Sequence, residues 1–479
     1  MKSNPDLSNL SQILTSVMLS PGKVTVVGSL NVDLTVRVEE FPAPGETVPA
    51  SDLTYGPGGK SSNQAVAASK SGANVAMVGA VGLDAYGSFV QRSLEEAGVD
   101  TSRVVARDLP TGTALITVNA DGENTIVYSA GANQSVSRAD LQAAADVLQP
   151  SDVVALGFES PASVVAAAID VARSGAHAST KTSVRPHSGT SANMNTGTCS
   201  NMNTGTSTNV DQNNAPRKNR FKAVDGRGIR RPPQIVLNYS PIIDVDPRLI
   251  RGVDIVVVNE IELRALGKRY GSAQLPTQGR GGLVNVAGSK GDEHADAKPA
   301  DAPTPHDSAE HDPADGMTKE GSASENDLFA IATRIVASMD LRGLIVTLGP
   351  EGCFVVESDA SSESGDINPT SDAHPTNPIG DDSSRDRTNP INLTNATNTA
   401  PITKGVYVQG HSVDAVDSTG CGDCFMGTVA ASIASGRGLL DSARLATFVA
   451  SRAATKQGAQ NSYFSAEELA DELSHEHAN

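Results

Sequence analysis

The chain has no tryptophan, and aromatic residues make up only 3% of its 479 residues. A hydrophobic core must therefore be built from Val, Leu, Ile and Ala, which suits an α/β protein. Four cysteines in so long a chain provide no disulfide framework. Basic residues are outnumbered: 37 Lys and Arg against 55 Asp and Glu give a net charge of -18. Neither nucleic acid nor an anionic membrane surface is therefore an expected partner.

Long apolar runs are also missing. No segment approaches the roughly 20 consecutive apolar residues that span a bilayer, and residues 1–20 lack the basic region and apolar core of a signal peptide. We therefore expect a cytoplasmic protein in which residues 1–20 form an N-terminal extension.

Short β-branched runs alternate with helical segments along most of the chain. This order predicts an α/β fold with a doubly wound, mostly parallel sheet. A hairpin is expected where Asp121-Gly122 separates residues 113–119 from 124–129. It is predicted to form a small sheet with the extended residues before Gly58. The expected strands of the main sheet are residues 24–28, 74–81, 153–157, 235–238, 255–258 and 343–348, and the expected helices include 86–97, 139–148 and 163–174.

Three segments break this pattern: 178–220 is rich in Ser, Thr and Asn, 288–325 is acidic, and 358–400 is rich in Asp, Ser, Asn and Pro. Such compositions bury too little apolar surface to offset chain entropy, so we expect disordered insertions, with partner-docking loops as the alternative. Without them roughly 300 residues remain, an ordinary size for one domain.

The run Asp417-Ser-Thr-Gly-Cys-Gly-Asp-Cys-Phe425 places small residues and a carboxylate where an apolar helix starts. Backbone N–H groups of Gly420 to Gly422 at a helix N-terminus would attract a phosphate, and Asp423 would accept a proton from an attacking hydroxyl. An ordinary glycine-rich turn is the plain alternative. Cys421 and Cys424 also form a CxxC, but no second CxxC or His pair accompanies it to support redox or zinc chemistry.

Several motifs in order resemble the carbohydrate kinases of the ribokinase-like (PfkB) family. They are Gly28-Ser-Leu-Asn-Val-Asp33, Phe41-Pro-Ala-Pro-Gly-Glu-Thr47, Gly58-Gly-Lys-Ser-Ser-Asn63, Asn259-Glu-Ile-Glu262, Thr347-Leu-Gly349 and Asp417 to Asp423. The resemblance covers nearly the whole chain outside the three insertions. It implies one ribokinase-like domain over residues 21–470, with a small β-sheet lid from about 34–57 and 110–130.

The resemblance implies that Asp423 is the catalytic base and that Gly420, Cys421 and Gly422 form the anion hole. A small polyol needs donors and acceptors at fixed positions, and a strand end and a helix start supply them here. Without the family match, Asn31 and Asp33 would read as a polar strand end, and Glu159 as a plain loop carboxylate. The implied sugar-binding residues are Asn31, Asp33, Gly58, Gly59, Lys60, Asn63, Glu159 and Asp423.

A nucleotide site and two cations are implied as well. Glu262 would serve Mg²⁺ through water, since Mg²⁺ prefers oxygen ligands and keeps several waters; helix capping is the alternative. The implied ATP-binding residues are Asn259, Glu262, Thr347, Gly349, Pro350, Glu351, Gly352, Gly422 and Thr447. The implied K⁺ loops contain Asp417, Thr419, Ala453, Lys456, Gly458 and Ser462.

The implied reaction is ATP-dependent phosphorylation of the 5-hydroxyl of D-ribose, with the lid closing over the sugar and pairing with a second copy in a homodimer. The alternatives are a related kinase acting on deoxyribose, fructose or a nucleoside, and a catalytically inactive sugar-binding regulator. Two departures from the family pattern matter. Ser61-Ser62 stands where Gly-Ala is common, which would strain a positive φ, and Cys421 suggests sensitivity to thiol reagents.

Overall fold

A nine-stranded sheet runs through the centre of the part of the chain that the structure describes. The computed structural model describes residues 5–178, 231–270, 325–358 and 404–478. Seven neighbouring strands of this sheet, from β5 at one edge to β11, are parallel. The remaining two, β12 and β13, pair antiparallel at the other edge. The predicted doubly wound α/β fold is thus confirmed. The strand order is β13 (Lys404–Gln409), β12 (Gly352–Glu357), β11 (Gly343–Thr347), β10 (Ile255–Asn259), β9 (Gln234–Asn238), β8 (Val153–Gly157), β1 (Lys23–Val27), β4 (Asn74–Gly82) and β5 (Asp100–Arg107).

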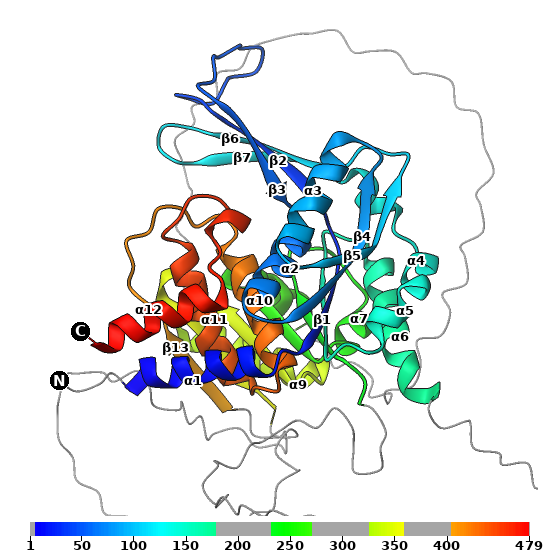
Figure 1. Ribbon diagram of the computed structural model, residues 1–479, viewed down its shortest axis with the longest axis vertical. Helices are drawn as coiled ribbons and strands as arrows, with labels where there is room; N and C mark the ends of the chain where they lie inside the picture. Colours follow the sequence, from blue (N-terminus) through cyan, green and yellow to red (C-terminus); the bar gives the residue numbers. More distant parts are fainter. Residues whose placement is uncertain (1–4, 179–230, 271–324, 359–403, 479) are drawn as a thin grey trace, which may run out of the picture.

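Helices cover both faces of this sheet and enclose two hydrophobic cores (Figure 1). The inner strands are buried on both sides, which is why their sequences read as continuous β-branched runs. One core involves α1 (Pro5–Leu19), α2 (Lys60–Lys70), α3 (Ala85–Glu96), α10 (Cys421–Ala434), α11 (Leu439–Ala453) and α12 (Ala466–Ala478). The other involves α4 (Arg138–Ala143), α5 (Ala145–Leu148), α6 (Ala162–Ala178), α7 (Pro247–Arg251), α8 (Glu260–Tyr270) and α9 (Glu325–Met339).

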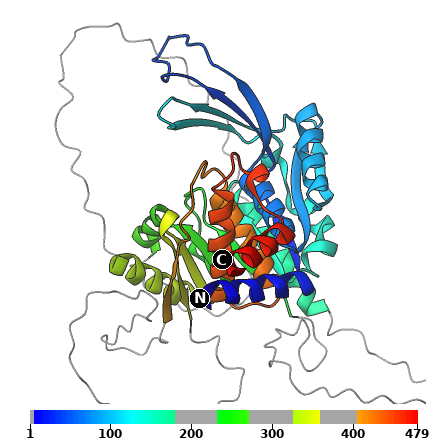
Figure 2. The same cartoon turned by 60° about the vertical axis from the view of Figure 1, so that its left-hand side comes forward.

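A separate four-stranded sheet, the lid, projects from the top of the body in both ribbon views (Figures 1 and 2). Its order is β3 (Leu53–Gly58), β2 (Asn31–Arg37), β6 (Gly112–Val118) and β7 (Asn124–Ser129). The predicted hairpin around Asp121-Gly122 is confirmed, and it joins the extended residues before Gly58 through a parallel pairing of β2 with β6.

Three expectations differ from the structure or lie outside it. Residues 1–20 are more than an extension, because α1 buries Leu10, Ile13, Leu14 and Val17 in the first core. The helix expected over 139–148 is two short helices that meet at Ala144. The expected insertions 178–220, 288–325 and 358–400 lie, but for single end residues, outside the described residues.

Helices α2 and α10 touch at Gly427. A Cβ at that position would lie 2.4 Å from the Gln64 carbonyl oxygen and 2.6 Å from Ala67 Cβ. These two helices carry residues of both sequence signatures, so their close approach sets the geometry of the site described below.

We expect Gly427→Ala to lower the free energy of unfolding by about 1–3 kcal/mol, the usual cost of forcing extra atoms into a packed core. Urea unfolding measures this change. Gly56→Ala is the matched control, because nothing lies within 4 Å of its added Cβ and its φ is not positive, and it should stay within about 0.5 kcal/mol of the wild type. Equal stability of the two variants would contradict the close contact.

Candidate active site

Asp423 lies in the first turn of α10, and both of its carboxylate oxygens are bound by α2. Asn63 Nδ2 donates to Oδ2 at 3.0 Å, and Gln64 Nε2 donates to Oδ1 at 3.3 Å. The side chain is almost fully buried. The fold therefore joins two motifs that are far apart in sequence, since 360 residues separate Asn63 from Asp423.

Burial raises the pKa of Asp423 above its ordinary value, and the nearby carboxylate of Glu159 acts in the same direction. The Lys60 ammonium and the amide donors of Asn63 and Gln64 oppose this rise. A carboxylate with a raised pKa is a stronger base than an exposed one, which suits proton abstraction.

The N-terminus of α10 starts at Gly420, which adopts the left-handed conformation at φ 75°. Glycine takes this conformation without a steric penalty. The first helical bond runs from the Cys424 N–H to the Gly420 carbonyl, so the Gly422 and Asp423 amides precede it. The Cys421 amide, which the sequence placed in the anion hole, donates to the Ser418 carbonyl at 3.2 Å. In this structure Gly422 is thus better placed than Cys421 to receive an anion.

The sugar-side residues gather where β2, β3 and α2 meet. Asp33 on β2 lies against Gly58, where a Cβ would fall 2.1 Å from the carboxylate. Burial, with the Glu159 and Asp423 carboxylates, raises the pKa of Asp33 to about 6. Gly59, at φ 91°, is the N-cap of α2. The absence of side chains at Gly58 and Gly59 therefore makes room for the carboxylate and the turn.

Glu159 follows β8 and caps the N-terminus of α2. Its Oε2 accepts the Lys60 backbone N–H at 3.0 Å and the Ser29 hydroxyl, an arrangement that favours a carboxylate at a helix start. Burial alone would lower the pKa of Lys60, but the carboxylates of Asp423, Glu159 and Glu262 outweigh it and raise that pKa. Lys60 thus lies among carboxylates from three separate parts of the chain.

Asn31 is held by Asn133, a residue that the sequence motifs did not assign to the site. Asn133 Nδ2 donates to Asn31 Oδ1 at 2.7 Å, and Asn133 Oδ1 accepts the Leu30 N–H at 2.9 Å. Gln64 and Gln460 were also missed, although Gln64 directly follows Asn63 on a helix start. Gln460 is 397 residues from its partner Asn63, so no local signal could connect them.

The strain expected at Ser61 is absent because of its place in α2. Among the described residues other than glycine, only Asp340 has a positive φ, so Ser61 bears no such strain. Its hydroxyl fits because Gly28 has no side chain: a Cβ on Gly28 would lie 1.9 Å from Ser61 Oγ. Ser62 is accommodated as well, since its hydroxyl donates to the carbonyls of Gly58 and Gly59.

Cys421 is a weaker nucleophile than the sequence suggested. Burial and the carboxylates of Asp417 and Asp423 raise the pKa of its thiol to about 11. Since the thiolate is the reactive form, little of it exists at neutral pH. Cys421, Cys424 and Cys353 are free thiols, and the described residues contain no group of three or more His, Cys, Asp or Glu side chains suited to hold a metal.

Most of the residues assigned to ATP follow the carboxyl ends of β10 and β11, where Asn259 and Thr347 face each other in register. Gly422 lies in α10 and Thr447 in α11. Asn259 and Glu262 cap each other, with the Asn259 N–H donating to Glu262 Oε2 at 2.8 Å and the Glu262 N–H to Asn259 Oδ1 at 2.9 Å. The capping alternative is thus present in the structure. One Glu262 oxygen remains outside this pair, which fits Mg²⁺ held through water.

The glycine-rich loop after β11 folds as a short 3-10 helix, Gly349–Glu351, and Gly352 opens β12 at φ 108°. Thr447, which was also assigned to ATP, contacts the residue that directly follows this loop. Its hydroxyl is buried in α11, where it donates to the Ala443 carbonyl at 2.8 Å and contacts Cys353 Sγ.

The two loops assigned to K⁺ are joined by Asp417. Its Oδ1 accepts the Thr419 N–H and its Oδ2 accepts the Gly458 N–H, each at 2.9 Å. Burial would raise the pKa of Asp417, but these hydrogen bonds lower it. The Ala453 carbonyl, at the end of α11, accepts the Lys456 N–H at 3.2 Å, and the Ser462 hydroxyl donates to the Ala459 carbonyl at 2.8 Å. The Lys456 ammonium lies over the Phe464 ring. Carbonyl and hydroxyl oxygens with one carboxylate are ligands that suit a hard cation.

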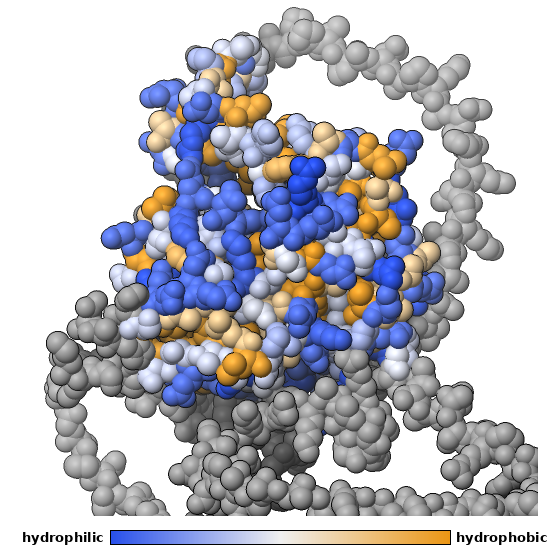
Figure 3. All heavy atoms as spheres, viewed as in Figure 1, coloured by the Kyte–Doolittle hydropathy of each residue, from blue (hydrophilic) through white to orange (hydrophobic). Residues whose placement is uncertain are grey.

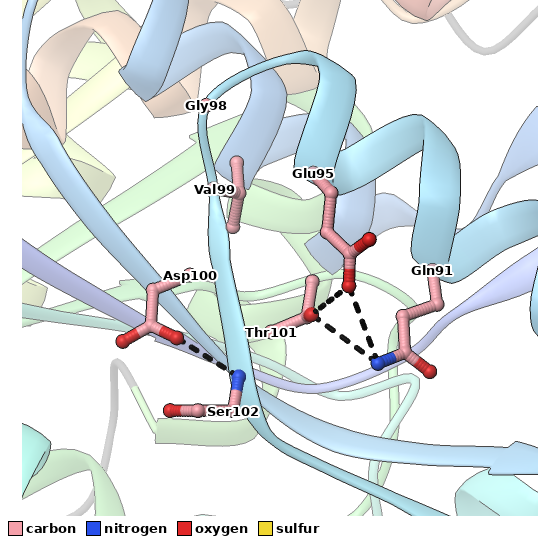
Figure 4. A pocket seen from close by; sticks show the side chains of 7 residues that line it. All are labelled: Gln91, Glu95, Gly98, Val99, Asp100, Thr101 and Ser102. Carbon is pink, nitrogen blue, oxygen red and sulfur yellow. Dashed lines mark hydrogen bonds between the residues drawn. The ribbon is translucent and has the colours of Figure 1, made fainter.

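A separate surface depression lies between α3 and the start of β5 (Figure 4). There Thr101 donates to Glu95 at 2.6 Å, and Gln91 donates to Thr101 at 3.2 Å. These polar groups satisfy one another, and none of the lining residues belongs to the site around Asp423. The depression therefore adds nothing to the chemistry.

Comparison with known proteins places these motifs in context. A family model described as pfkB family carbohydrate kinase matches residues 22–205 and 399–466, together more than half of the chain. Ribokinase of Staphylococcus aureus is 35% identical over 154 residues, 32% of this chain and 50% of that protein. Mouse ribokinase is 39% identical over 154 residues, 32% and 48% of the two chains. Deoxyribokinase of Salmonella typhi is 37% identical over 150 residues, 31% and 48%. The matches thus span about half the length of these curated relatives.

Solved structures match along nearly the whole chain. The structure of ribokinase from Giardia lamblia aligns with a TM-score of 0.59 at 19% identity, covering 95% of this chain and 99% of that one. Arabidopsis thaliana ribokinase, solved with ribose and ATP, aligns with a TM-score of 0.56 at 19% identity and the same coverage. At 19% identity, this structural similarity shows that the chain shares the fold of these two proteins. No helix among the described residues has the length and apolar character to cross a membrane.

Proposed function

The chain belongs to the pfkB family of carbohydrate kinases, and from this premise we propose that it transfers the γ-phosphoryl group of ATP to the 5-hydroxyl of D-ribose. The observation that carries the proposal is the placement of Asp423, buried at the N-terminus of α10 and bound by Asn63 and Gln64 of α2. Phosphoryl transfer asks a protein mainly for positioning and charge stabilisation, and this arrangement supplies both.

In the proposed reaction Asp423 takes the proton of the 5-hydroxyl as that oxygen forms a bond to the γ-phosphorus. The bond from the γ-phosphorus to the β,γ-bridging oxygen breaks, which yields ADP and ribose 5-phosphate. The Gly422 amide and the positive end of α10 stabilise the charge on the transferred group. Lys60 lies close enough to Asp423, Glu159 and Glu262 for electrostatic coupling. Its ammonium would therefore also offset the negative charge of ATP phosphates bound beside these carboxylates.

Sugar hydroxyls would be held by Asn31, Asp33, Asn63 and Glu159. The Asn133 contact fixes the orientation of the Asn31 amide, so Asn31 presents a defined donor to the sugar. Mg²⁺, when held through Glu262, would neutralise charge on the ATP phosphates. The K⁺ loops around Asp417 would organise the start of α10 without touching the sugar.

Deoxyribose is the second candidate substrate, favoured by the deoxyribokinase relative of Salmonella typhi. It would share the 5-hydroxyl chemistry and lack one hydroxyl contact. The inactive-regulator alternative rested on Ser61, Ser62 and the three insertions. The fit of Ser61 and Ser62 without backbone strain, and the hydrogen bond of Asn63 to Asp423, support the kinase proposal over it.

The lid is the surface that we propose pairs with a second copy of the chain. Tyr55, Leu115 and Val127 lie on one face of its sheet by strand register and are exposed. Apolar surface on the lid is visible at the top of Figure 3. Exposed apolar patches commonly mark protein contacts. Sedimentation equilibrium tests the proposed homodimer, and a mass equal to that of one chain at all concentrations would exclude it.

We expect ATP-dependent turnover of ribose to exceed that of 2-deoxyribose, fructose and adenosine, and to rise when K⁺ replaces Na⁺. A coupled assay for ADP release, with each sugar product identified by mass, measures it. Preferred turnover of deoxyribose would move the assignment to the second candidate. Ribose binding without turnover of any acceptor would instead support the regulator.

A further inference from the structure

The segment Gln460–Tyr463, here called the clamp segment, contacts both helices that carry the proposed reaction groups. It begins with a short 3-10 helix, Gln460–Ser462, two residues after Gly458. Gln460 and Tyr463 are both buried. They bind different helices, one side chain reaching α2 and the other the start of α10.

Gln460 is bound through every polar atom of its side chain. Its Nε2 donates to Asn63 Oδ1 at 2.9 Å and to Ser62 Oγ at 3.2 Å, and its Oε1 accepts the Ser93 hydroxyl at 3.4 Å. An amide held on three sides cannot rotate without losing hydrogen bonds in a buried site, where unpaired polar groups are costly.

This contact and the contact with Asp423 together fix which way the Asn63 amide faces. With Oδ1 on Gln460, Asn63 Nδ2 points to the Asp423 carboxylate. The opposite orientation would place two donors against each other at Gln460 and two acceptors against each other at Asp423. Gln460 therefore reinforces the orientation that the Asp423 carboxylate also requires, and it holds the Asn63 amide from the side opposite Asp423.

Tyr463 acts on the other helix. Its hydroxyl donates to the Gly420 carbonyl at 2.8 Å, and Gly420 is the residue from which α10 starts. Lys70 Nζ, at the end of α2, donates to the Tyr463 carbonyl at 2.7 Å and to the Gln460 carbonyl at 3.4 Å. The clamp segment is thus fastened to α2 at two points and to the helix start beside the anion hole at a third.

We propose that the clamp segment is a positioning element in which Gln460 fixes the Asn63–Asp423 pair and Tyr463 fixes the start of α10. The inference rests on the proposed sugar-kinase function, since it assigns Asn63 to the sugar and α10 to the phosphate. The two residues therefore have separable effects: Gln460 acts on sugar binding and on the base, and Tyr463 acts on phosphoryl transfer.

The test is steady-state kinetics of the full chain carrying Gln460→Met or Tyr463→Phe. Losing a buried hydrogen bond changes a rate or binding constant by roughly 3- to 10-fold. We expect Gln460→Met to raise the KM for ribose and to lower kcat by about that factor, with the KM for ATP unchanged. Tyr463→Phe should lower kcat by a similar factor and leave the KM for ribose unchanged.

Gln149→Met is the matched control. Gln149 is partly buried and makes two comparable hydrogen bonds, to Val171 and Ser174, on α6. It should leave all three constants unchanged. If the Gln460 and Gln149 variants behave alike, or if the Gln460 variant alters the KM for ATP and for ribose equally, the positioning role is refuted, because general loosening would explain the result.

A readout without turnover separates this inference from the proposed function. Selective ¹⁵N labelling of asparagine side chains, with Asn63→Ala to assign the signal, reports the Asn63 amide. We expect slow hydrogen exchange of this amide in the wild type and fast exchange in Gln460→Met. If the wild type phosphorylates no acceptor but exchange changes as expected, the proposed function fails and the clamp contact stands. Unchanged exchange in Gln460→Met overturns the inference, whatever the activity.

Discussion

Asp423→Asn is expected to lower kcat by about 10²- to 10⁴-fold, the contribution typical of a positioned general base. Asparagine keeps the size of the side chain but cannot accept the proton of the attacking hydroxyl. Its amide also brings a donor toward either Asn63 Nδ2 or Gln64 Nε2, which now both donate to the carboxylate. One of those bonds is therefore lost in addition to the base.

Kinetics at saturating ribose and ATP measure this change, and calorimetric titration of ribose shows whether the sugar site survives. Asp254→Asn is the control, because Asp254 is an equally buried aspartate that directly precedes β10, at the opposite end of that strand from Asn259. It is bound by Arg173 and the Ile235 N–H. Its loss should reduce stability and leave kcat intact. An Asp423→Asn enzyme that retains more than about a tenth of the wild-type kcat would contradict the role of base.

Lys60→Met is expected to cause the second largest loss of activity. It should also shift the dependence of kcat/KM on pH. The base works when Asp423 is ionised, so activity falls as the pH drops through the pKa of Asp423. Burial already raises this pKa, and Lys60 opposes the rise. Removing the ammonium raises the pKa further, because an opposite charge at short range lowers a carboxyl pKa by roughly 1 or more.

The acidic limb of kcat/KM against pH should therefore move to higher pH, and activity on that limb should fall roughly tenfold for each increase of 1 in the pKa of Asp423. Raising the pH should restore part of the loss. The charged groups facing Asp423 from other elements are Asp33 and Glu159. Burial raises the pKa values of the neighbouring Cys421, Cys424 and Tyr463 above their ordinary values, so these groups stay neutral along the acidic limb. These remain in both enzymes, so the difference between the profiles reports Lys60.

Lys60→Arg separates charge from shape. It retains a cation on a longer, planar side chain, so its acidic limb should stay near that of the wild type even if its KM values change. If the acidic limb of the Lys60→Met variant coincides with that of the wild type, the Lys60 ammonium does not act on Asp423.

The central strands and the lid hairpin could be predicted because their signals are local. A strand such as β10 is a continuous β-branched run, and Asp121-Gly122 is a turn between two alternating runs. Helix α1 also has a local signal, since Leu10, Ile13, Leu14 and Val17 share a helical face. The prediction for residues 1–20 named only an N-terminal extension and did not use this pattern.

Strands β12 and β13 are different, because they pair across residues 358–403, and no pattern in either strand identifies its partner. The same holds within the site. The hypothesis that Asp423 is the base follows from the helix start that surrounds it. Its contacts with Asn63 and Gln64, and the further link from Asn63 to Gln460, span most of the chain. Residue type indicates the chemistry; only packing determines which groups meet.

Gly28 and Ser61 illustrate how that packing restricts the substitutions that the protein can accept. An alanine at 28 collides with the Ser61 hydroxyl, whereas a glycine at 61 would leave the space above Gly28 open. A side chain can therefore occupy one of these two positions but not both at once. The order of mutation matters: Ser61→Gly must come before Gly28→Ala, and the reverse order passes through a disfavoured intermediate. The serine that departs from the usual family motif is thus one half of a mutually dependent pair, and its tolerance is a property of position 28.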